Sequence, residues 1–291
     1  CHAAQSKNQS ADCPPSAQVG GPAEKDMVLL PRRAAALRQV RQLSLEGEGI
    51  SRSRAGGVSD SARIIEIFSS LQGEGIYVGR SHLFVRFWNC NLNCHYCDTD
   101  YRGPYVEYTL RRLSSEVERF LSTEGPFHAV SLTGGEPLLW HQFLRVWLPW
   151  LKGREQTTYL ETNGTLPEAL AEVLPWVDIV AMDLKPPSAT ADRPVWSEHE
   201  RFLRIAHQAG RDVFVKIVVT ARTQDEEIHR ALRLVASVDR AIPAVLQPVT
   251  PWGAVKEKPS ELQLFRWKQM ACEDLADVRI LPQVHRLLGV P

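Results

Sequence analysis

The sequence has no net charge, no long hydrophobic run and no framework of paired cysteines. Its 34 basic and 34 acidic side chains balance, so it lacks the basic excess typical of nucleic-acid-binding proteins. The longest apolar runs, such as Val213–Val219, are far too short to span a bilayer. Six cysteines, some clustered and some scattered, argue against a disulfide scaffold and for a reducing compartment. These absences predict a soluble, cytoplasmic protein that binds neither nucleic acid nor membrane.

The N-terminal part of the chain differs in composition from the rest. It is rich in Ser, Ala, Gly, Gln, Arg and Pro, with one modest apolar helical pattern around Met27–Leu45. It lacks the basic start, the continuous apolar stretch and the small-residue cleavage site of a secretory signal. The chain opens on Cys1, and its first methionine is Met27. We therefore expect residues 1–60 to be a disordered leader that need not be native, and residues 61–291 to form the catalytic domain.

From Arg63 onward, β-rich runs alternate with helical patterns, for example over Leu110–Leu121 and Ile228–Val238, which is typical of a parallel α/β sheet. The expected strands are Ile64–Phe68, His82–Trp88, Ala129–Leu132, Thr158–Glu161, Ile179–Leu184, Val213–Val219 and Ala244–Gln247. Several of these strands end on polar motifs, and α/β barrels and open sheets bind ligands at the carboxyl ends of strands. We expect a partial (β/α) barrel that is open on one side.

The most informative motif is the C-x3-C-x2-C spacing of Cys90, Cys94 and Cys97. Structural zinc sites and electron-transfer clusters normally have four protein ligands, whereas three thiolates leave one iron of a [4Fe-4S] cluster open. An open iron can chelate S-adenosylmethionine and pass an electron into its sulfonium, which releases a 5′-deoxyadenosyl radical. A zinc knuckle completed by His95 is the alternative, but His95 adjoins Cys94 and would have to fold back on its neighbour.

A second motif, Thr133-Gly-Gly-Glu-Pro137, follows the expected strand Ala129–Leu132. Its paired glycines would let the backbone approach a ligand closely, although such a stretch alone could be an ordinary tight turn. Radical S-adenosylmethionine enzymes carry a Gly-Gly-Glu-Pro motif at this place after their cysteines, and its backbone pairs with the amino group of the methionine moiety. The two motifs in this order identify the chain as a member of that superfamily.

Polar groups also end the later strands. Glu161, Thr162 and Asn163 offer a carboxylate, a hydroxyl and an amide suited to ribose hydroxyls and the methionine carboxylate, next to an Asn-Gly turn. Asp183 and Lys185 share one face of a strand, which could equally be a solvated rim.

The segment Leu71-Gln-Gly-Glu-Gly75, between the first two expected strands, is either a flexible turn or a binding element. Gln72 and Glu74 would supply an amide and a carboxylate suited to the donor and acceptor edge of a pterin or purine. Arg86 could anchor a substrate carboxylate by a bidentate contact. The pair Asp98-Thr99 follows the last cysteine of the motif, where an oxygen ligand could hold a hard cation.

Together these features resemble the 7-carboxy-7-deazaguanine synthases, a radical enzyme family of the queuosine (7-deazapurine) pathway. The resemblance covers about Arg63–Pro291 and is most specific in Leu71–Gly75, in the cysteine loop through Thr99, and in the ending Gln283–Pro291. It implies that 6-carboxy-5,6,7,8-tetrahydropterin is rearranged, with ring contraction and loss of ammonia, to 7-carboxy-7-deazaguanine. The radical would take a hydrogen from C6 of the pterin and return it after the rearrangement. The resemblance also implies a [4Fe-4S] cluster, S-adenosylmethionine used catalytically, Mg²⁺, a donor such as flavodoxin or ferredoxin, and a homodimer.

The resemblance also implies roles for individual residues. The cluster would be held by Cys90, Cys94 and Cys97, and Mg²⁺ by Thr99. The pterin would contact Leu71, Gln72, Gly73, Glu74, Arg86, Thr133 and Pro291. S-adenosylmethionine would contact Gly135, Glu136, Glu161, Thr162, Asn163, Asp183, Lys185, Gln247, Pro248, Val249 and Thr250. Chains of the family end inside the active site, and the expectation for Pro291 rests on this sequence also stopping there.

Two alternatives stay open at this point. A glycyl-radical-activating enzyme shares the cysteine spacing, but it would act on a protein, which leaves the Gln-Gly-Glu-Gly turn without a task. A non-catalytic iron-sulfur or zinc-binding protein would use the same thiols. Iron and sulfide content separates the zinc protein from the others, and formation of 5′-deoxyadenosine separates a cluster carrier from a radical enzyme.

Overall fold

The computed structural model describes residues 60–291, so the expected leader at residues 1–60 lies outside the described residues except for its last position. A nine-stranded sheet of order β3-β1-β2-β4-β5-β6-β7-β8-β9 forms its centre. β1 (Ser61–Leu71) pairs antiparallel with β2 (Ser81–Phe87) and β3 (Val106–Thr109), and every later pairing is parallel. The later strands are β4 (Ala129–Gly134), β5 (Thr158–Thr162), β6 (Ile179–Leu184), β7 (Asp212–Val219), β8 (Ala244–Pro248) and β9 (Val278–Ile280).

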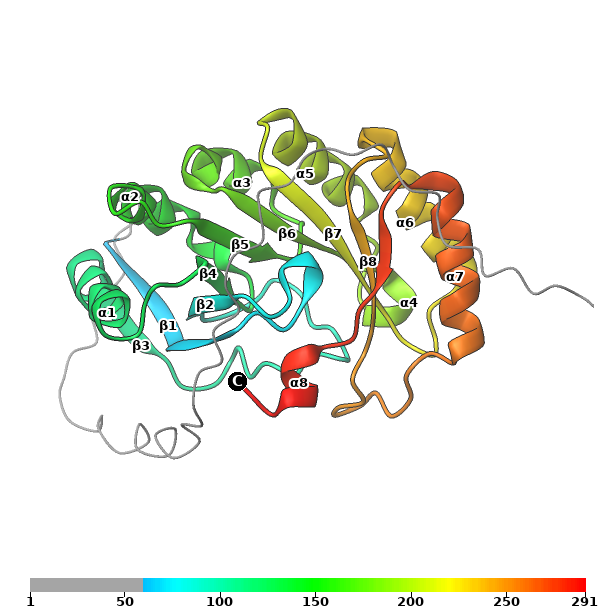
Figure 1. The fold of residues 1–291 in the computed structure, drawn as a ribbon, viewed down its shortest axis with the longest axis horizontal. Coiled ribbons are helices and arrows are strands. Elements are labelled where there is room, and N and C mark those ends of the chain that lie inside the picture. The colour runs from blue at the N-terminus through cyan, green and yellow to red at the C-terminus, as the bar shows by residue number, and fades with distance from the viewer. Residues whose placement is uncertain (1–59) are drawn as a thin grey trace, which may run out of the picture. The chain divides into compact units, whose positions relative to one another are not determined.

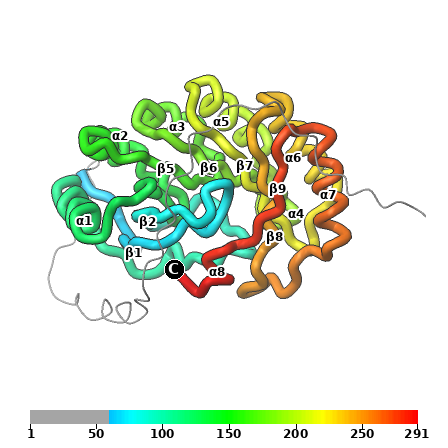
Figure 2. The backbone as a smooth tube through the Cα atoms, viewed as in Figure 1, coloured from blue at the N-terminus to red at the C-terminus, as the bar shows by residue number. Residues whose placement is uncertain are grey.

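The long helices follow one another along the outer side of this curved sheet (Figure 1). They are α1 (Leu110–Thr123), α2 (His141–Lys152), α3 (Pro167–Val173), α5 (Trp196–Gln208), α6 (Asp225–Val238) and α7 (Glu261–Asp274). The short helices α4 (Pro187–Thr190) and α8 (Val284–Leu288) lie apart from this row, and α8 leads to the C-terminus near β1 and β2 (Figures 1 and 2). No helix within residues 60–291 is long and apolar enough to cross a membrane.

The two faces of the sheet have different cores. On the helix side, α2 buries Phe143, Leu144, Trp147 and Leu148, which recur at the spacing of one helical face. The opposite, inner face carries a smaller cluster of buried apolar residues, made of Ala129, Tyr159, Ile179, Ala181 and Phe214. Most of these inner residues lie at or near the starts of their strands, and the carboxyl ends are left for polar side chains.

The expected fold class is confirmed, because the sheet is open: β3 and β9 are its edges and do not pair with each other within residues 60–291. Each expected strand overlaps a strand of the sheet. The expectations omitted β3 and β9, which have four and three residues. Strands this short have too few residues to show an alternating pattern, and their pairing partners supply the hydrogen bonds that define them.

Candidate functional site

A cavity of about 520 Å³ opens at the carboxyl ends of the strands, and we call it the strand-end pocket. The strands β2, β4, β5, β6, β7 and β8 each contribute a polar side chain to it: Arg86, Thr133, Glu161, Asp183, Lys216 and Gln247, in that order across the sheet. Alternation along the strands explains this ring. Glu161 comes two residues after Tyr159, and Lys216 two residues after Phe214, so each lies on the face of its inner apolar neighbour but nearer the strand end.

The cysteine loop follows β2, and Cys90, Cys94 and Cys97 all line the strand-end pocket as free, partly buried thiols. Burial raises the pKa of Cys90 to about 11 and also raises the pKa of the other two thiols. A bound metal is the group that would stabilise their thiolate forms at neutral pH. His95, the ligand of the zinc alternative, is exposed and does not line the pocket.

Among residues 60–291, no three His, Cys, Asp or Glu side chains are placed to hold a single metal ion. A [4Fe-4S] cluster does not need such a group, because each thiolate binds a different iron of the cubane. Three thiols from one loop, all lining one cavity, fit that cluster in number and in chemistry.

The Gly-Gly-Glu-Pro segment packs directly against the cysteine loop. A Cβ atom added at Gly134 would lie 2.2 Å from the carbonyl oxygen of Phe87, and one at Gly135 would lie 2.0 Å from that of Asn89. Gly134 also has a φ of +136°, which L side chains rarely adopt. The two glycines therefore allow the end of β4 to approach the cysteine loop, in addition to lining the strand-end pocket.

Glu136 does not line the strand-end pocket, so the expectation that it contacts the cofactor finds no support in its placement. Its carboxylate is buried and accepts hydrogen bonds from Thr162 Oγ1 at 2.9 Å, Asn163 N at 2.8 Å and Leu138 N at 2.9 Å. Burial raises the pKa of Glu136 to about 7, although these donors favour its ionised form. Glu136 thus fixes Thr162 and Asn163, which do line the pocket.

The buried Glu136 predicts a pH dependence of stability. Its pKa of about 7 in the fold exceeds the usual 4.5, so the folded protein binds this proton more tightly than the unfolded chain does. Its contribution is therefore present at low pH and is lost as the pH rises through about 7. Relative to Glu136→Gln, we expect the wild type to lose about 3 kcal/mol of unfolding free energy between about pH 5 and pH 8. Urea unfolding measures this difference, and a pH-independent difference would contradict a titrating buried carboxyl.

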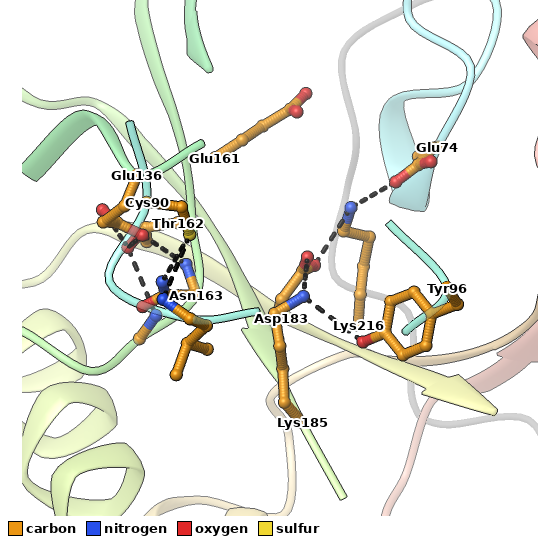
Figure 3. Close-up of polar contacts among 12 residues, drawn as sticks. Glu74, Cys90, Tyr96, Glu136, Glu161, Thr162, Asn163, Asp183, Lys185 and Lys216 are labelled. Atoms are coloured by element: carbon orange, nitrogen blue, oxygen red, sulfur yellow. Dashed lines mark hydrogen bonds and ion pairs between the residues drawn. The ribbon is translucent and has the colours of Figure 1, made fainter. Parts of the chain in front are cut away.

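Two lysines and two carboxylates form a charge network across the strand-end pocket (Figure 3). Lys216 Nζ contacts the carboxylate of Glu74 and forms an ion pair with Asp183, whose Oδ1 lies 3.0 Å away. The geometry of this second contact is not that of a hydrogen bond. Lys185 Nζ lies 3.0 Å from Asp183 Oδ2 and 3.4 Å from the hydroxyl of Tyr96 in the cysteine loop. The network therefore runs from the β1–β2 connection to the cysteine loop.

The charges in this network hold one another ionised. Burial alone would raise the pKa of Glu74, but the charge of Lys216 and hydrogen bonds from Lys216, Gln283 and Gln247 lower it to about 2. Burial would also lower the pKa of Lys185 and Lys216, but the nearby carboxylates raise both well above their usual range. At neutral pH, Glu74 and both lysines are charged.

Lys216, which is 3% exposed, is not among the site residues expected from the sequence. A signal was present, because Lys216 is the only charged side chain in the apolar run Val213–Val219. A charge in a strand buried on both faces must be paired or functional. Tyr96 was also missed, since its position between two cysteines of the motif gave no reason to assign it a contact.

The residues expected to contact the pterin all line the strand-end pocket: Leu71, Gln72, Gly73, Glu74, Arg86, Thr133 and Pro291. Gln72 Nε2 donates to Glu161 Oε1 at 2.7 Å, and Gln72 Oε1 accepts from Glu74 N at 3.0 Å. Thr133 Oγ1 donates to Glu161 Oε2 at 2.9 Å. These bonds give Gln72 and Thr133 fixed orientations in the pocket.

The C-terminal segment closes one side of the strand-end pocket. Val284 N donates to Gly73 O at 2.9 Å, and Gln283 Nε2 donates to Glu74 Oε1 at 2.8 Å. A Cβ atom at Gly73 would lie 2.1 Å from Nδ1 of His285, so a glycine is needed for this close approach. The carbonyl of Pro291, itself in the pocket, accepts a 2.9 Å hydrogen bond from the Ser70 hydroxyl.

Most residues expected to contact S-adenosylmethionine also line the strand-end pocket, namely Gly135, Glu161, Thr162, Asn163, Asp183, Lys185, Gln247 and Val249. Pro248 and Thr250 do not line it, which follows from the alternation of side chains at the end of β8. Asn163 Nδ2 donates to Asn91 Oδ1 at 2.8 Å, which ties the end of β5 to the cysteine loop.

Comparison with known proteins agrees with this geometry. The Radical SAM superfamily matches residues 87–235, which span the cysteine loop and strands β4 to β7. The 7-carboxy-7-deazaguanine synthase of Geobacter sulfurreducens is 42% identical over 248 residues, 78% of this chain and 97% of the relative. The enzyme of that name from Methanothermobacter thermautotrophicus is 34% identical over 252 residues, 79% of this chain and 98% of the relative.

Two solved structures share the fold. The crystal structure of QueE from Escherichia coli has a TM-score of 0.53 and 18% identity, over 77% of this chain and 95% of that one. Streptococcus suis SuiB bound to its precursor peptide has a TM-score of 0.52 and 17% identity, over 66% of this chain and 46% of that one. The superfamily match and the identity to curated relatives over nearly their full length show that the chain belongs to the 7-carboxy-7-deazaguanine synthase family of radical S-adenosylmethionine enzymes.

Proposed function

We propose that the protein converts 6-carboxy-5,6,7,8-tetrahydropterin to 7-carboxy-7-deazaguanine by radical ring contraction with loss of ammonia, in queuosine biosynthesis. One observation carries the proposal: the three thiols and the Gln72-Gly-Glu74 turn line the same cavity. A radical source and a site for a nitrogen heterocycle are thus adjacent. Three thiols that would hold the radical-generating cluster, and the groups suited to the heterocycle, belong to one cavity.

The radical S-adenosylmethionine family implies a [4Fe-4S] cluster on Cys90, Cys94 and Cys97 and S-adenosylmethionine as cofactor. When bound, this pair supplies a 5′-deoxyadenosyl radical that takes a hydrogen atom from the substrate. We assign the cofactor contacts to the pocket residues nearest the cysteine loop in the hydrogen-bond network, which include Asn163 and Lys185. Glu136 supports this side from behind the pocket.

The other side of the strand-end pocket suits the pterin. Glu74 and Gln72 present a carboxylate and an amide to a heterocycle with neighbouring N–H donors and a carbonyl acceptor. Arg86 supplies a cation for the substrate carboxylate. Thr133 and Pro291 complete this side with a hydroxyl and a carbonyl. We assign to these groups the binding and orientation of the pterin.

We assign the hydroxyl of Thr99 as a ligand of Mg²⁺. Thr99 lines the strand-end pocket in the cysteine loop, and its hydroxyl oxygen lies 3.5 Å from Arg86 NH1. Magnesium is typically held by one or two protein oxygens together with substrate oxygens and water. Thr99 lies beside the guanidinium that we assign to the substrate carboxylate, so one carboxylate could contact both. An electron donor such as flavodoxin or ferredoxin and a homodimeric state stay predictions from the resemblance.

Thr99→Ala is expected to raise the Mg²⁺ concentration for half-maximal rate about tenfold, because it deletes one oxygen ligand and leaves the thiolates intact. Initial rates over a magnesium titration measure the effect, and cluster iron should equal that of the wild type. Thr123→Ala on α1 is the matched control, since the Thr123 hydroxyl donates to Arg119 O in its own helix and does not line the strand-end pocket. Identical magnesium curves for wild type and Thr99→Ala would remove Thr99 from the metal site.

The proposed function is tested by ammonia release from the cluster-loaded protein under anaerobic conditions. Release should require the carboxytetrahydropterin, S-adenosylmethionine and a reductant together, with more ammonia formed than S-adenosylmethionine consumed. A glycyl-radical-activating enzyme would instead accumulate 5′-deoxyadenosine without releasing ammonia from the pterin. That outcome would overturn the proposal while leaving the superfamily membership intact.

A further inference from the structure

Lys216 has no role in the function described so far, yet its placement is costly. It is 3% exposed, on β7, and its ammonium contacts two carboxylates, Glu74 and Asp183. Removing a cation from water is unfavourable unless its partners are well placed, and an apolar side chain of similar size often serves stability as well or better. The location of Lys216 in the wall of the strand-end pocket therefore points to a task in substrate binding.

The partner that faces the substrate side is Glu74. Its carboxylate accepts hydrogen bonds from Lys216 on β7 and from Gln283 Nε2, the latter at 2.8 Å. The backbone of Glu74 is fixed as well, because its N–H donates to Gln72 Oε1 at 3.0 Å. Lys216 and Gln283 occupy one position each on Oε2 and Oε1. The Gln247 side chain donates to the same carboxylate. A carboxylate can accept about four hydrogen bonds, so a position stays open for one further donor.

Without Lys216, Glu74 and Asp183 would face each other as like charges in a buried site. Both lie within ion-pair distance of the same ammonium. Lys185 would still neutralise Asp183, whereas Glu74 would keep only the amide donors Gln283 and Gln247 and would therefore take up a proton more readily. A protonated Glu74 would offer an O–H donor where the substrate also offers N–H donors. Lys216 prevents this exchange of acceptor for donor.

We propose that Lys216 is a positioning residue that holds Glu74 as an oriented, ionised acceptor for the exocyclic amino group of the substrate ring. The inference rests on the proposed function, since the pterin carries an exocyclic amino group beside a ring N–H. The Lys216–Glu74 pair then makes the enzyme specific for rings that carry this amino group. A site built to accept an N–H rejects the analogue that lacks it, because its acceptor is left unpaired.

The test compares the pterin with its 2-desamino analogue, using anaerobic, cluster-loaded wild type, Lys216→Met and Lys216→Arg. We expect Lys216→Met to raise KM for the pterin about 10- to 100-fold, the effect of losing hydrogen bonds to a charged group. KM for the analogue should change less than about threefold, and KM for S-adenosylmethionine less than about twofold. Lys216→Arg should retain most of the preference for the pterin, because it keeps the charge.

Lys152→Met is the matched control. Lys152 on α2 pairs with Asp178 at 2.7 Å, outside the strand-end pocket, so its loss removes a lysine ion pair without touching the site. Its KM values should equal those of the wild type. If Lys216→Met raises KM equally for the pterin and for its 2-desamino analogue, the inference is wrong and Lys216 acts on packing. If it raises KM for S-adenosylmethionine instead, the inference is also wrong and Lys216 acts on the cofactor through Asp183.

A double-mutant cycle covers the case in which Lys216→Met fails to fold. Glu74→Gln/Lys216→Met carries no unpaired charge at Glu74, and its pterin KM should lie within about twofold of that of Glu74→Gln alone, because Lys216 acts through Glu74. A large further increase would overturn the inference. A wild type that forms no deazaguanine would overturn the proposed function and this inference together, whereas an active wild type with unchanged Lys216 variants would overturn only the inference.

Discussion

Cys94→Ala protein, reconstituted anaerobically with iron and sulfide, is expected to lose most of its cluster iron and to show no detectable turnover. Cys90, Cys94 and Cys97 are the three thiols of the strand-end pocket, and the remaining two cannot hold a cubane with three protein-bound irons. Without the cluster no electron reaches S-adenosylmethionine. Neither 5′-deoxyadenosine nor product should form, and Cys90→Ala or Cys97→Ala should behave alike.

Cys272→Ala provides the matched control for this experiment. Cys272 lies on α7 and does not line the strand-end pocket, so its replacement should leave cluster iron and rate unchanged. Iron and sulfide analysis, together with the absorbance of the cluster, measures the cluster content. Liquid chromatography of 5′-deoxyadenosine measures the rate. A fully active Cys94→Ala protein would end the radical hypothesis.

Arg86→Met is expected to lower kcat/KM for the pterin about 100- to 1000-fold, corresponding to loss of a charge-assisted contact with the substrate carboxylate. The guanidinium is already held in the strand-end pocket: its Nε lies 2.7 Å from Glu66 Oε1, and its Cζ stands 5.3 Å from the centre of the Phe68 ring. A side chain fixed in this way loses little entropy when it binds. Arg86→Lys should restore little activity, because a lysine cannot form the planar two-point contact.

Arg145→Met is the matched control for Arg86. Arg145 on α2 lies 3.7 Å from Glu172 and does not line the strand-end pocket, so the rate should not change. An analogue of the pterin without its carboxylate shows whether the loss of activity in Arg86→Met comes from the carboxylate contact or from a change in pocket shape. Arg86→Met should bind this analogue as well as the wild type does. An equal loss of affinity for pterin and analogue would mean that Arg86 shapes the pocket rather than binding the carboxylate.

The parts of the site that the sequence predicts are those contained in short contiguous segments. The cysteine loop and the Gly-Gly-Glu-Pro segment have spacings that few other chemistries need, and their residues meet because both follow neighbouring parallel strands, β2 and β4. The expected open barrel is confirmed for a similar reason. Alternating strands and helices leave few topologies available, and ligands collect at one edge of such a sheet.

The parts that the sequence does not predict depend on long-range register. Lys216 meets Glu74 across 142 residues, and Asp183 stands opposite Lys216 only because β6 and β7 pair in one register. Periodicity shows which strand faces are buried but not which charges meet there. The burial of Glu136 behind the strand-end pocket was also missed, since a motif does not show which way each side chain points.

The most direct test of this account is anaerobic incubation of the cluster-loaded protein with 6-carboxy-5,6,7,8-tetrahydropterin, S-adenosylmethionine, Mg²⁺ and a reductant, followed by mass detection of the product. We expect 7-carboxy-7-deazaguanine to form over several turnovers, and its formation to be abolished when the reductant or S-adenosylmethionine is left out. Cleavage of S-adenosylmethionine to 5′-deoxyadenosine with the pterin recovered unchanged would contradict it.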